Sequence, residues 1–377
     1  MPEQALPSIS VVVPVLNEER FIENTLSQLF SQSYPDDRVE FLIVDGGSTD
    51  NTVALIESQM ASTSRRAKLI TNPKGRSSAG RNLGICAAQG DFVLFVDGHV
   101  FIPHGRVLQR MGEAVVEQGA EVLGRPQPLT PPGLSCLQQA IAGVRTSPLG
   151  HSKESFIYSR FEGHVSPLSV GVMYKRSLFS AFGLFNESFD AAEDVEFNYR
   201  LEKAGITAYV SPEFAIEYYP RSGLRQLFRQ MERYGIGRTR FIRQYQERIR
   251  AEMFVPLVSS GLLVMSPFLY FAAEPMRPLL VILAVVCVLM VMLLAAYPQG
   301  RPRPGWTVQL LTPVCFVTIH LGLASGILKG MRPGAKATSG TATGCPSQTV
   351  VYAASSGTSR RLMGDIAGES AVVKKPG

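Results

Sequence analysis

The segment Ile9–Val15 (ISVVVPV), followed by the turn Asn17-Glu18-Glu19, indicates how this chain folds. A short run of mostly β-branched residues with a proline near its end is typical of a buried strand. Over residues 21–30, apolar side chains recur three and four positions apart, which predicts a helix. The chain therefore opens with a strand, a polar turn and a helix.

The alternation of strand and helix continues to residue 97. The apolar runs VEFLIV over 39–44 and DFVLFV over 91–96 predict buried strands, with a shorter one at Lys68–Thr71. Helices are predicted to begin near Thr52 and to cover residues 77–88. Such an alternation folds into a mostly parallel sheet with helices on both faces. We therefore expect an α/β domain.

Three polar residues come directly after strands of this predicted sheet or one residue later. They are Asn17, Asp45 and Asp97. Ligands of open parallel sheets bind beyond the carboxyl ends of the strands, so these side chains are expected along one binding edge. The first strand is not followed by the glycine-rich dinucleotide fingerprint, and the sequence has no Walker A motif. A nucleotide would have to be bound by another arrangement.

The net charge of +6 has a local origin. Nine arginines and two glutamates lie between Arg221 and Arg250, and the rest of the chain is nearly neutral. A nucleic-acid-binding surface would spread its positive charge more widely, so we expect no nucleic-acid partner. A basic block before an apolar segment is typical of the cytoplasmic flank of a membrane region.

The C-terminal third contains three uncharged apolar stretches: Met253–Ala273, Pro278–Tyr297 and Gly305–Leu328. Each is near the roughly 20 residues that a helix needs to cross a bilayer, and we expect three spans. The first stretch contains Pro256 and Pro267, so a re-entrant or interfacial segment is the alternative. The N-terminus has no basic region followed by an apolar core, which predicts that the first domain stays in the cytosol.

Several sequence blocks, in their order and spacing, resemble family 2 glycosyltransferases with the GT-A fold. The resemblance runs from Ser8 to about Tyr234, and within the family it is strongest to bacterial exopolysaccharide enzymes of the succinoglycan-biosynthesis type. The matching blocks are VVVPVLNEERFIENTL, EFLIVDGGSTDNT, GRSSAGRNLGICAAQGDFVLFVDGH, AEDVEFNYRL and RQMERYG. The resemblance implies a GT-A nucleotide-sugar-binding domain followed by C-terminal transmembrane helices.

The predicted organisation has four parts. Residues 1–220 form the catalytic domain, 221–250 a basic amphipathic interfacial helix region, 251–330 the transmembrane region, and 331–377 a disordered tail. Between the catalytic domain and the membrane, an apolar stripe from Leu224 to Tyr234 predicts an amphipathic helix at the bilayer surface. The protein is expected as a multi-pass protein of the bacterial inner (cytoplasmic) membrane, with its catalytic domain in the cytosol.

The resemblance also implies which residues bind the donor. In similar enzymes, the acidic residue after the second strand contacts the nucleoside, which corresponds to Asp45. The turn that follows the first strand contributes Pro14, Asn17 and Glu18. Helix capping is the alternative role for Asn17 and for the nearby Asp50, and for Asp50 it is the favoured one. Phosphate-binding candidates before the fourth strand are Lys74, Arg76 and Arg81.

Asp97 is the main candidate for binding a divalent cation, Mg²⁺ or Mn²⁺, that neutralises the donor diphosphate. The family motif is D-x-D, but this chain has Asp97-Gly98-His99. An imidazole suits Mn²⁺ better than Mg²⁺, so His99 is a second metal-ligand candidate. A hydrogen bond from His99 to phosphate and a purely structural turn histidine are its alternatives.

A single-displacement transfer with inversion needs a general base for the acceptor hydroxyl. The family's acidic pair near a helix start corresponds to Glu193-Asp194, with Asp194 as the base and Glu193 as its orienting neighbour. The alternative is that both acids only stabilise the positive end of the helix dipole. The block from Gln230 to Tyr234 resembles the acceptor-site motif Q-x-x-R-W of processive synthases, with Tyr234 in place of tryptophan and Arg233 retained.

The expected function is inverting transfer of a hexosyl group from a nucleotide-diphosphate donor, a UDP-sugar, to a polyprenyl-diphosphate-linked saccharide in exopolysaccharide biosynthesis. Expected partners are thus the nucleotide-sugar, the polyprenyl-linked glycan and membrane lipid. Two alternatives stay open. The acceptor could be polyprenyl phosphate itself, or the protein could be a non-catalytic membrane component of a polysaccharide assembly complex.

Overall fold

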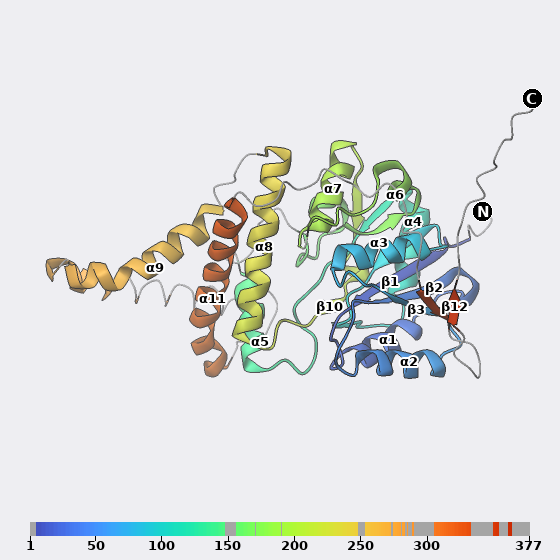
Figure 1. Ribbon diagram of the computed structural model, residues 1–377, viewed down its shortest axis with the longest axis horizontal. Helices are drawn as coiled ribbons and strands as arrows, with labels where there is room; N and C mark the ends of the chain where they lie inside the picture. The colour runs from blue at the N-terminus through green and yellow to red at the C-terminus, as the bar shows by residue number, and fades with distance from the viewer. Residues whose placement is uncertain are drawn as a thin grey trace, which may run out of the picture.

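The structure is a computed structural model. It describes residues 5–147, 156–169, 171–189, 191–247, 253–272, 274–279, 281–282, 285, 289, 305–332, 350–353 and 361–363. Two parts stand side by side in Figure 1: a sheet flanked by helices, and a group of long helices next to it.

The strands begin and end close to the sequence expectation in the first hundred residues. They are β1 (Ile9–Val15), β2 (Val39–Asp45), β3 (Ala67–Thr71), β4 (Phe92–Phe95), β5 (Val100–Phe101), β6 (Val122–Gly124), β7 (Gly163–Val165), β8 (Gly171–Lys175), β9 (Ala208–Val210), β10 (Glu217–Tyr218), β11 (Val350–Ala353) and β12 (Arg361–Met363).

Helices connect these strands and continue beyond them. They are α1 (Ile22–Phe30), α2 (Thr52–Ser62), α3 (Ser77–Ala87), α4 (Val107–Gln118), α5 (Cys136–Thr146), α6 (Ser177–Phe182), α7 (Glu193–Lys203), α8 (Leu224–Tyr245), α9 (Phe254–Ala272) and α11 (Trp306–Met331), with 3₁₀ turns at Asp36–Arg38, Pro167–Ser169, Pro212–Phe214 and Glu274–Met276.

The central strands β3, β2, β1 and β4 are neighbours in that order and all run parallel. This confirms the mostly parallel sheet. Figure 1 shows α3 on one face and α1 and α2 on the other. The registers Val15 with Asp45 and Val12 with Phe95 bring the carboxyl ends of three strands to one edge, as parallel strands require.

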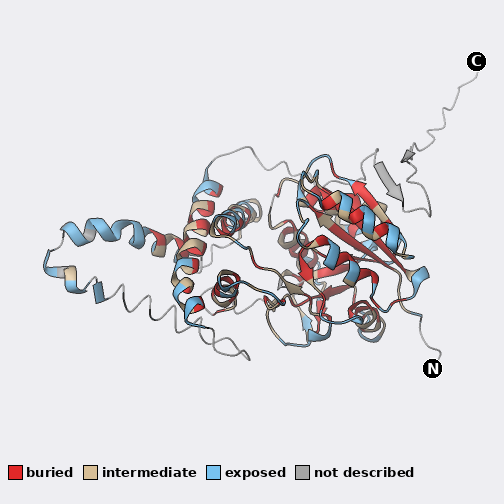
Figure 2. Ribbon diagram, turned by 90° about the horizontal axis from the view of Figure 1, so that it is seen from below, coloured by how far each residue is buried: buried red, intermediate tan, exposed pale blue. Residues whose placement is uncertain are grey.

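Beyond β4 the sheet becomes mixed. Strand β8 pairs antiparallel with both β4 and β6, and β9 then pairs parallel with β6. Figure 2 shows the strands buried between their helices, with Val11, Val12 and Val13 fully buried in β1. We call the sheet with α1–α4, α6 and α7 the sheet domain.

Helices α5, α8 and α11 pack against one another beside the sheet domain, and we call them the helix layer (Figure 1). Its core joins Ile141 of α5, Leu227 of α8 and Cys315 of α11. The amphipathic helix expected from Leu224 is α8, and it runs to Tyr245. The helix layer therefore contains α8, from the basic segment 221–250, and α11, from the apolar stretch Gly305–Leu328.

Glycines let α8 and α11 approach closely. A Cβ atom added to Gly326 would lie 2.1 Å from the Glu232 carbonyl oxygen, and one added to Gly235 would lie 2.5 Å from the Leu323 carbonyl oxygen. Both distances are far below van der Waals contact, so neither position accepts a side chain without moving a backbone. Close backbone packing at small residues is characteristic of membrane helix pairs.

The three expected membrane spans are supported only in part. Among the described residues, Trp306–Met331 is the helix that is long and apolar enough to cross a membrane, and 44% of its most apolar window is buried against other helices. The apolar segment Phe254–Phe268 within α9 is shorter. Most of the expected span Pro278–Tyr297 lies outside the described residues, so three spans are not confirmed.

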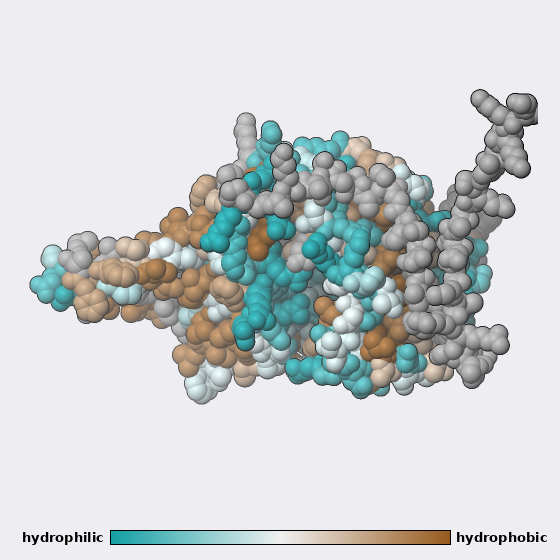
Figure 3. Space-filling view, in the orientation of Figure 1, coloured by the Kyte–Doolittle hydropathy of each residue, from teal (hydrophilic) through white to brown (hydrophobic). Residues whose placement is uncertain are grey.

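Helix α9 projects away from the rest of the molecule (Figure 1). Its apolar side chains are largely exposed, as Phe268 and Phe271 illustrate with 65% and 74% exposure. Figure 3 shows hydrophobic residues gathered over α9 and hydrophilic residues along α8. A large exposed apolar surface of this kind marks contact with lipid or protein.

Most of the predicted disordered tail lies outside the described residues. Two of its segments are described as strands, with β11 pairing antiparallel with β3 and β12 with β11. They extend the sheet on the side opposite β4.

Candidate active site

A cavity of about 770 Å³ lies between the carboxyl edge of the sheet, the start of α7 and the helix layer. Its lining includes Pro14 near the end of β1, Glu18 after β1, Asp97 after β4 and the pair Glu193-Asp194 at the start of α7. Gln230, Arg233 and Tyr234 of α8 form part of the opposite wall. Residues that are far apart in the chain and that the sequence marked separately thus meet around one space.

Asn17 and Asp45 lie at the same edge but hold the turn after β2. The Asp45 carboxylate accepts hydrogen bonds from the Ser48 hydroxyl at 2.6 Å and from the Gly47 N–H at 3.0 Å. Asn17 has a left-handed backbone (φ 56°), and its side-chain oxygen accepts from the Thr49 N–H at 2.8 Å. Both side chains therefore shape the rim of the cavity, and neither is among its described lining residues.

Asp50 bonds the first residue of α2, although the N-cap position of that helix is Asn51. Its Oδ1 accepts from the Thr52 N–H at 3.0 Å and from the Thr52 hydroxyl. Burial acts to raise the pKa of Asp50, but the bonds from Thr52 and from the Glu19 N–H together outweigh it and lower the pKa of the carboxyl.

His99 lies between two protein partners. Its Nδ1 is 2.7 Å from Glu18 Oε1, and its Nε2 is 2.5 Å from the Tyr218 hydroxyl. Burial raises the pKa of Tyr218 above its usual range, with Asp97 adding to the effect, so this hydroxyl keeps its proton. Glu18 thus makes a close ion-pair contact with one ring nitrogen, which has no hydrogen bond among the described residues, and Tyr218 is hydrogen-bonded to the other. The ring could then reach a metal ion only by giving up one of these partners.

Arg81 of α3 joins the two acidic walls of the cavity. Its Nη2 lies 3.9 Å from Asp97 and its Nε 3.5 Å from Glu193, while its guanidinium stacks over the Phe95 ring at 5.1 Å. Burial acts to lower the pKa of Arg81, but the charges of Glu193 and Asp97 outweigh it and raise the pKa. This arginine is therefore a fixed positive charge next to the two acids.

The other basic candidates differ in exposure. Lys74 is outside the cavity wall, and its Nζ bonds Glu187 at 2.6 Å. Arg76 lines the cavity and donates to the Glu187 carbonyl oxygen at 3.3 Å. Of the three phosphate-binding candidates, Arg81 thus lies deepest.

Helix α7 starts at a strained turn, where Ala192 has a positive φ of 67°. A non-glycine residue in this region costs energy and is often found at functional sites. Gly237 of α8 packs on this turn, because a Cβ there would lie 2.5 Å from the Ala191 carbonyl oxygen. The helix layer thus contacts the backbone that leads directly into Glu193-Asp194.

The two acids at the start of α7 have different surroundings. Glu193 is buried, and its Oε1 accepts from the Ser77 hydroxyl at 3.0 Å. Burial raises the pKa of Glu193, and the nearby Arg81 opposes the rise. Asp194 is half-buried at the cavity surface, with its Oδ1 held by the Val195 N–H at 2.9 Å. Asp194 is therefore the more accessible carboxylate.

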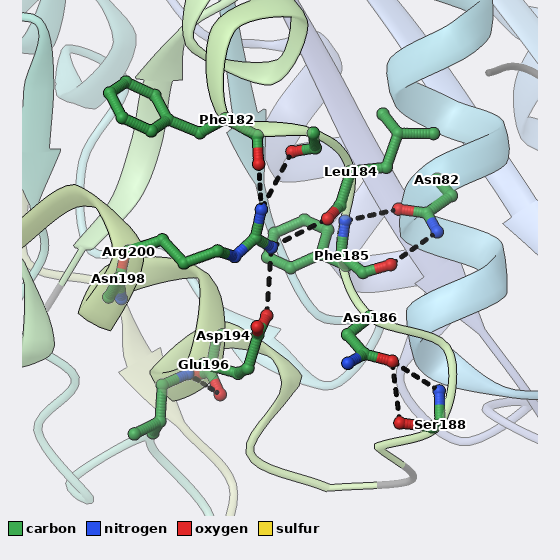
Figure 4. A network of polar contacts seen from close by, with 12 residues as sticks. Asn82, Phe182, Leu184, Phe185, Asn186, Ser188, Asp194, Glu196, Asn198 and Arg200 are labelled. Carbon is green, nitrogen blue, oxygen red and sulfur yellow. Dashed lines mark hydrogen bonds and ion pairs between the residues drawn. The ribbon is translucent and has the colours of Figure 1, made fainter. Parts of the chain in front are cut away.

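Figure 4 shows the contacts that hold α7 on the loop after α6, and the contacts between that loop and α3. Arg200 donates to the carbonyl oxygens of Phe182 and Leu184 and to the Glu196 carboxylate, while Asn82 of α3 bonds the Phe185 backbone. These contacts tie the catalytic candidates to α3 and to the loop after α6, so the acids sit on a rigid support.

The helix-layer wall of the cavity is basic. Gln230 is buried, and its Nε2 lies 3.5 Å from the Tyr234 hydroxyl. Arginines from α5, from α8 and from the segment before α8 also line this wall: Arg145, Arg221, Arg229 and Arg233. The acids of the sheet domain thus face a cluster of cations.

Sequence reasoning missed several lining residues, among them Arg125, Arg145, Tyr158 and Tyr218. Arg125 follows the apolar run of β6 directly, which is the signal that identified Asp97. Arg145 and Tyr218 become site residues only through the packing of α5 and of the β5–β10 pair. Among the described residues, no group of three or more His, Cys, Asp or Glu side chains is arranged to hold a metal ion.

Two family models match the chain. Residues 10–133 match the model described as "Glycosyl transferase family 2", and residues 141–298 match "Glycosyl transferase family group 2". The two matches together cover the sheet domain and reach into the apolar C-terminal region.

Curated relatives carry related names. The chain is 30% identical over 250 residues to succinoglycan biosynthesis protein ExoA of Rhizobium meliloti (strain 1021), covering 66% of this chain and 74% of that protein. It is 29% identical over 277 residues to a dolichyl N-acetyl-α-D-glucosaminyl phosphate 3-β-D-2,3-diacetamido-2,3-dideoxy-β-D-glucuronosyltransferase of Methanococcus voltae, covering 70% of this chain and 84% of the relative.

A solved structure shares the fold. The mannosyltransferase PcManGT from Pyrobaculum calidifontis, in complex with GDP-Man and Mn²⁺, aligns with a TM-score of 0.51 and 16% identity over 87% of this chain and 88% of its own. The likeness at this identity supports the fold expected from the sequence.

Proposed function

Because the chain belongs to glycosyltransferase family 2 and is a glycosyltransferase, we propose that it transfers a sugar with inversion from a nucleotide-diphosphate donor to a lipid-linked saccharide. One observation carries the proposal: Asp97, Asp194 and the basic wall of α8 line the same cavity. The donor side belongs to the sheet domain, and the acceptor side belongs to the helix layer.

On the donor side, we propose that Asp97 and the diphosphate oxygens together hold a divalent cation, Mg²⁺ or Mn²⁺. The Asp97 carboxylate faces the cavity with 31% of its side chain exposed, and its nearest cationic group is Arg81 at 3.9 Å. Such ions commonly bind through one or two carboxylates plus substrate phosphates, so a single aspartate fits. When bound, the cation would neutralise charge on the leaving diphosphate.

His99 has a different proposed role, because Glu18 and Tyr218 occupy its two ring nitrogens. We assign it to positioning the strand end that carries Asp97. The proposed donor site further includes Pro14 and Glu18 on the cavity wall, with Asn17 and Asp45 shaping its nucleoside edge. Lys74 would join it only on leaving Glu187.

On the acceptor side, Asp194 is the proposed general base. The acceptor hydroxyl oxygen forms a bond to the anomeric carbon, its proton passes to Asp194, and the nucleoside diphosphate leaves with the electrons of the broken C–O bond. The Val195 N–H orients the Asp194 carboxylate. Glu193 holds Arg81 and Ser77 in place beside it.

We propose that Gln230, Arg233 and Tyr234 contact the acceptor. An arginine pairs with phosphate oxygens, and an aromatic ring stacks on a sugar face. The neighbouring Arg145, Arg221 and Arg229 add positive charge that suits a phosphate- or diphosphate-linked saccharide. The Methanococcus voltae relative is named for a dolichyl phosphate-linked acceptor, which supports a lipid-linked saccharide over polyprenyl phosphate itself.

The proposed location is the cytosolic face of a membrane. The exposed apolar side chains of α9 and the apolar helix α11 would contact the bilayer, while the basic α8 lies next to them. We accordingly propose that residues 1–220 form the catalytic domain and residues 251–330 the membrane region, and that α8, in the 221–250 region, links the two.

The test is transfer by the detergent-solubilised full chain with membrane lipid extract as acceptor. UDP-glucose, UDP-glucuronic acid, UDP-GlcNAc and GDP-mannose would each be supplied with Mg²⁺, Mn²⁺ or a chelator, for the wild type and for Asp97→Asn. We expect one donor to be consumed in a metal-dependent way and Asp97→Asn to lose about 10²-fold or more of that activity. Wild-type binding of donors with no turnover of any would contradict the catalytic proposal and favour a non-catalytic assembly component.

A further inference from the structure

Arg125 is a deeply buried cation that faces the cavity without a full set of partners. It follows the last residue of β6 and is only 2% exposed. Its Nη2 donates to the Phe95 carbonyl oxygen over a long 3.5 Å. In the part of the chain that the structure describes, its Nε and Nη1 atoms have no hydrogen-bond partner. Burying the donors of a charged group without hydrogen bonds costs free energy of folding, so this arrangement needs an explanation.

The charge of Arg125 is also poorly balanced. Asp97 is the acid that acts on it, but Asp97 already lies 3.9 Å from the buried Arg81. Burial lowers the pKa of Arg125 to about 10, Asp97 opposes this, and Arg81 adds to it. Arg125 thus shares Asp97 with Arg81, which has Glu193 as a second acidic neighbour, and a cation bound at Asp97 would increase the positive charge around Arg125.

Arg65, an arginine that is not among the described lining residues of the cavity, has a fuller set of partners. Its side chain is similarly covered, with 14% exposed. It donates to the carbonyl oxygens of Phe30, Gln32 and Tyr34 at 3.1, 2.6 and 2.9 Å. Such a set of carbonyl acceptors satisfies a guanidinium within the protein. Arg125 lacks one, although it lies on the cavity wall.

We propose that Arg125 binds an oxyanion of the donor, either a phosphate of its diphosphate or a carboxylate on its transferred sugar. The inference rests on the proposed function, because it takes the donor to lie in this cavity. A guanidinium presents planar donors that match both kinds of oxyanion. The bound oxyanion would supply the acceptor atoms and the negative charge that the protein does not.

Binding and stability measured on the same variants test this assignment. The full detergent-solubilised chain would be compared as wild type, Arg125→Met, Arg125→Lys and the control Arg65→Met. Dissociation constants for UDP, UDP-glucose, UDP-glucuronic acid, GDP and GDP-mannose would be measured with Mn²⁺ by calorimetry. The Tm of each free protein would be recorded in parallel.

We expect Arg125→Met to weaken binding about ten- to a hundredfold while the Tm of the free protein stays unchanged or rises. Arg125→Lys should retain part of the affinity. Arg65→Met should show the opposite pattern, with a lower Tm and unchanged affinity. A loss that appears already with UDP or GDP identifies the phosphate, and a loss confined to UDP-glucuronic acid identifies the sugar carboxylate.

Two results would count against the inference, and they are distinguishable. If wild type binds nucleotides and Arg125→Met binds them equally well, Arg125 has no ligand role and only this inference fails. If Arg125→Met lowers the Tm as Arg65→Met does without changing affinity, its role is structural. If wild type binds none of the five nucleotides, the proposed function itself fails.

Discussion

The sheet domain and the helix layer are held together by different contacts. In the sheet domain, aliphatic and aromatic side chains such as Val12, Phe41 and Leu42 are fully buried between strands and helices. In the helix layer, α8 and α11 approach through Gly235 and Gly326, so that backbone lies against backbone. Large side chains fill the core of the sheet domain, whereas α8 and α11 can touch because glycine has no side chain.

The cavity between the two parts is also lined by different residues on its two sides. The sheet domain contributes the four carboxylates among the described lining residues, such as Asp97 and Asp194, together with arginines such as Arg125, whereas the helix layer contributes arginines such as Arg233 and no carboxylate. A reaction at this boundary requires that the two parts keep a fixed position relative to each other. Gly237, packed on the turn before α7, and the hydrogen bond from Tyr245 of α8 to Glu196 of α7 link them directly. Three substitutions can separate what each part contributes.

The largest effect is expected at the boundary itself. Asp194→Asn removes the proposed base without changing the size of the side chain, so turnover should fall by about 10²–10⁴-fold. Donor affinity and Tm should stay near those of the wild type, because Asp194 is half-buried and, among the described residues, its hydrogen bond comes from the next residue of its own helix. Initial rates, calorimetry and thermal unfolding on one preparation would separate these quantities.

Glu202→Gln is the matched control for Asp194→Asn. Glu202 lies at the other end of α7, where it accepts a hydrogen bond from Ser166. Its loss should leave turnover within a few-fold of the wild type. Equal turnover in Asp194→Asn and Glu202→Gln would show that another group accepts the proton.

The second-largest effect is expected from a substitution that disturbs only the helix layer. A leucine at Gly326 would clash with the α8 backbone at Glu232, whose carbonyl oxygen would lie 2.1 Å from the new Cβ. Overpacking of this kind costs about 1–3 kcal/mol or more. We therefore expect Gly326→Leu to lower the Tm and to reduce transfer to a lipid acceptor, while UDP or GDP binding by the sheet domain persists.

Gly261 offers the control for this substitution. It lies in α9, and a Cβ there would meet nothing within 4 Å. Gly261→Leu should therefore leave the Tm unchanged or slightly raised, because leucine favours helix more than glycine does. If Gly326→Leu had no larger effect than Gly261→Leu, the close packing of α8 and α11 would not hold in detergent.

The contrast between the two parts also explains what sequence could predict. The run ISVVVPV became β1 with the expected limits, because a fully buried strand of a parallel sheet leaves a continuous apolar pattern. Asp97 was found because it follows such a strand. Arg125 follows β6 in the same way, but it opens the proline- and glycine-rich segment over 125–133, which reads as a mere connection.

Other features depend on tertiary contacts that leave no periodic signal. The antiparallel β8 joins the sheet between β4 and β6, which is a question of topology and not of local pattern. The contacts of His99 with Glu18 and Tyr218 join segments that are 81 and 119 residues apart in the chain. Similarly, the apolar pattern of α11 is the same whether bilayer or protein surrounds it, so burial against α5 and α8 could not be predicted.

The smallest expected effect concerns the polar contact that accompanies the glycine packing. Glu232 of α8 accepts hydrogen bonds at 2.6 Å from both Lys329 and Ser325 of α11. These two bonds lower the pKa of Glu232 below its ordinary value of 4.5. The folded protein therefore binds fewer protons than the unfolded chain in the interval between the lowered pKa and 4.5. The contact should stabilise fully above that interval and lose its effect as the pH falls through it.

Lys329 is half exposed, so the stabilisation should be only about 0.2–1 kcal/mol and should weaken with salt. The measurement is the difference in unfolding free energy between the wild type and Glu232→Gln from pH 3 to pH 7. That difference should be positive at neutral pH and should shrink below about pH 4.5, whereas Gly326→Leu should be equally destabilising at every pH. A pH-independent Glu232→Gln difference would mean that the Glu232 charge does not help to join α8 to α11, and that close backbone packing alone joins the two helices.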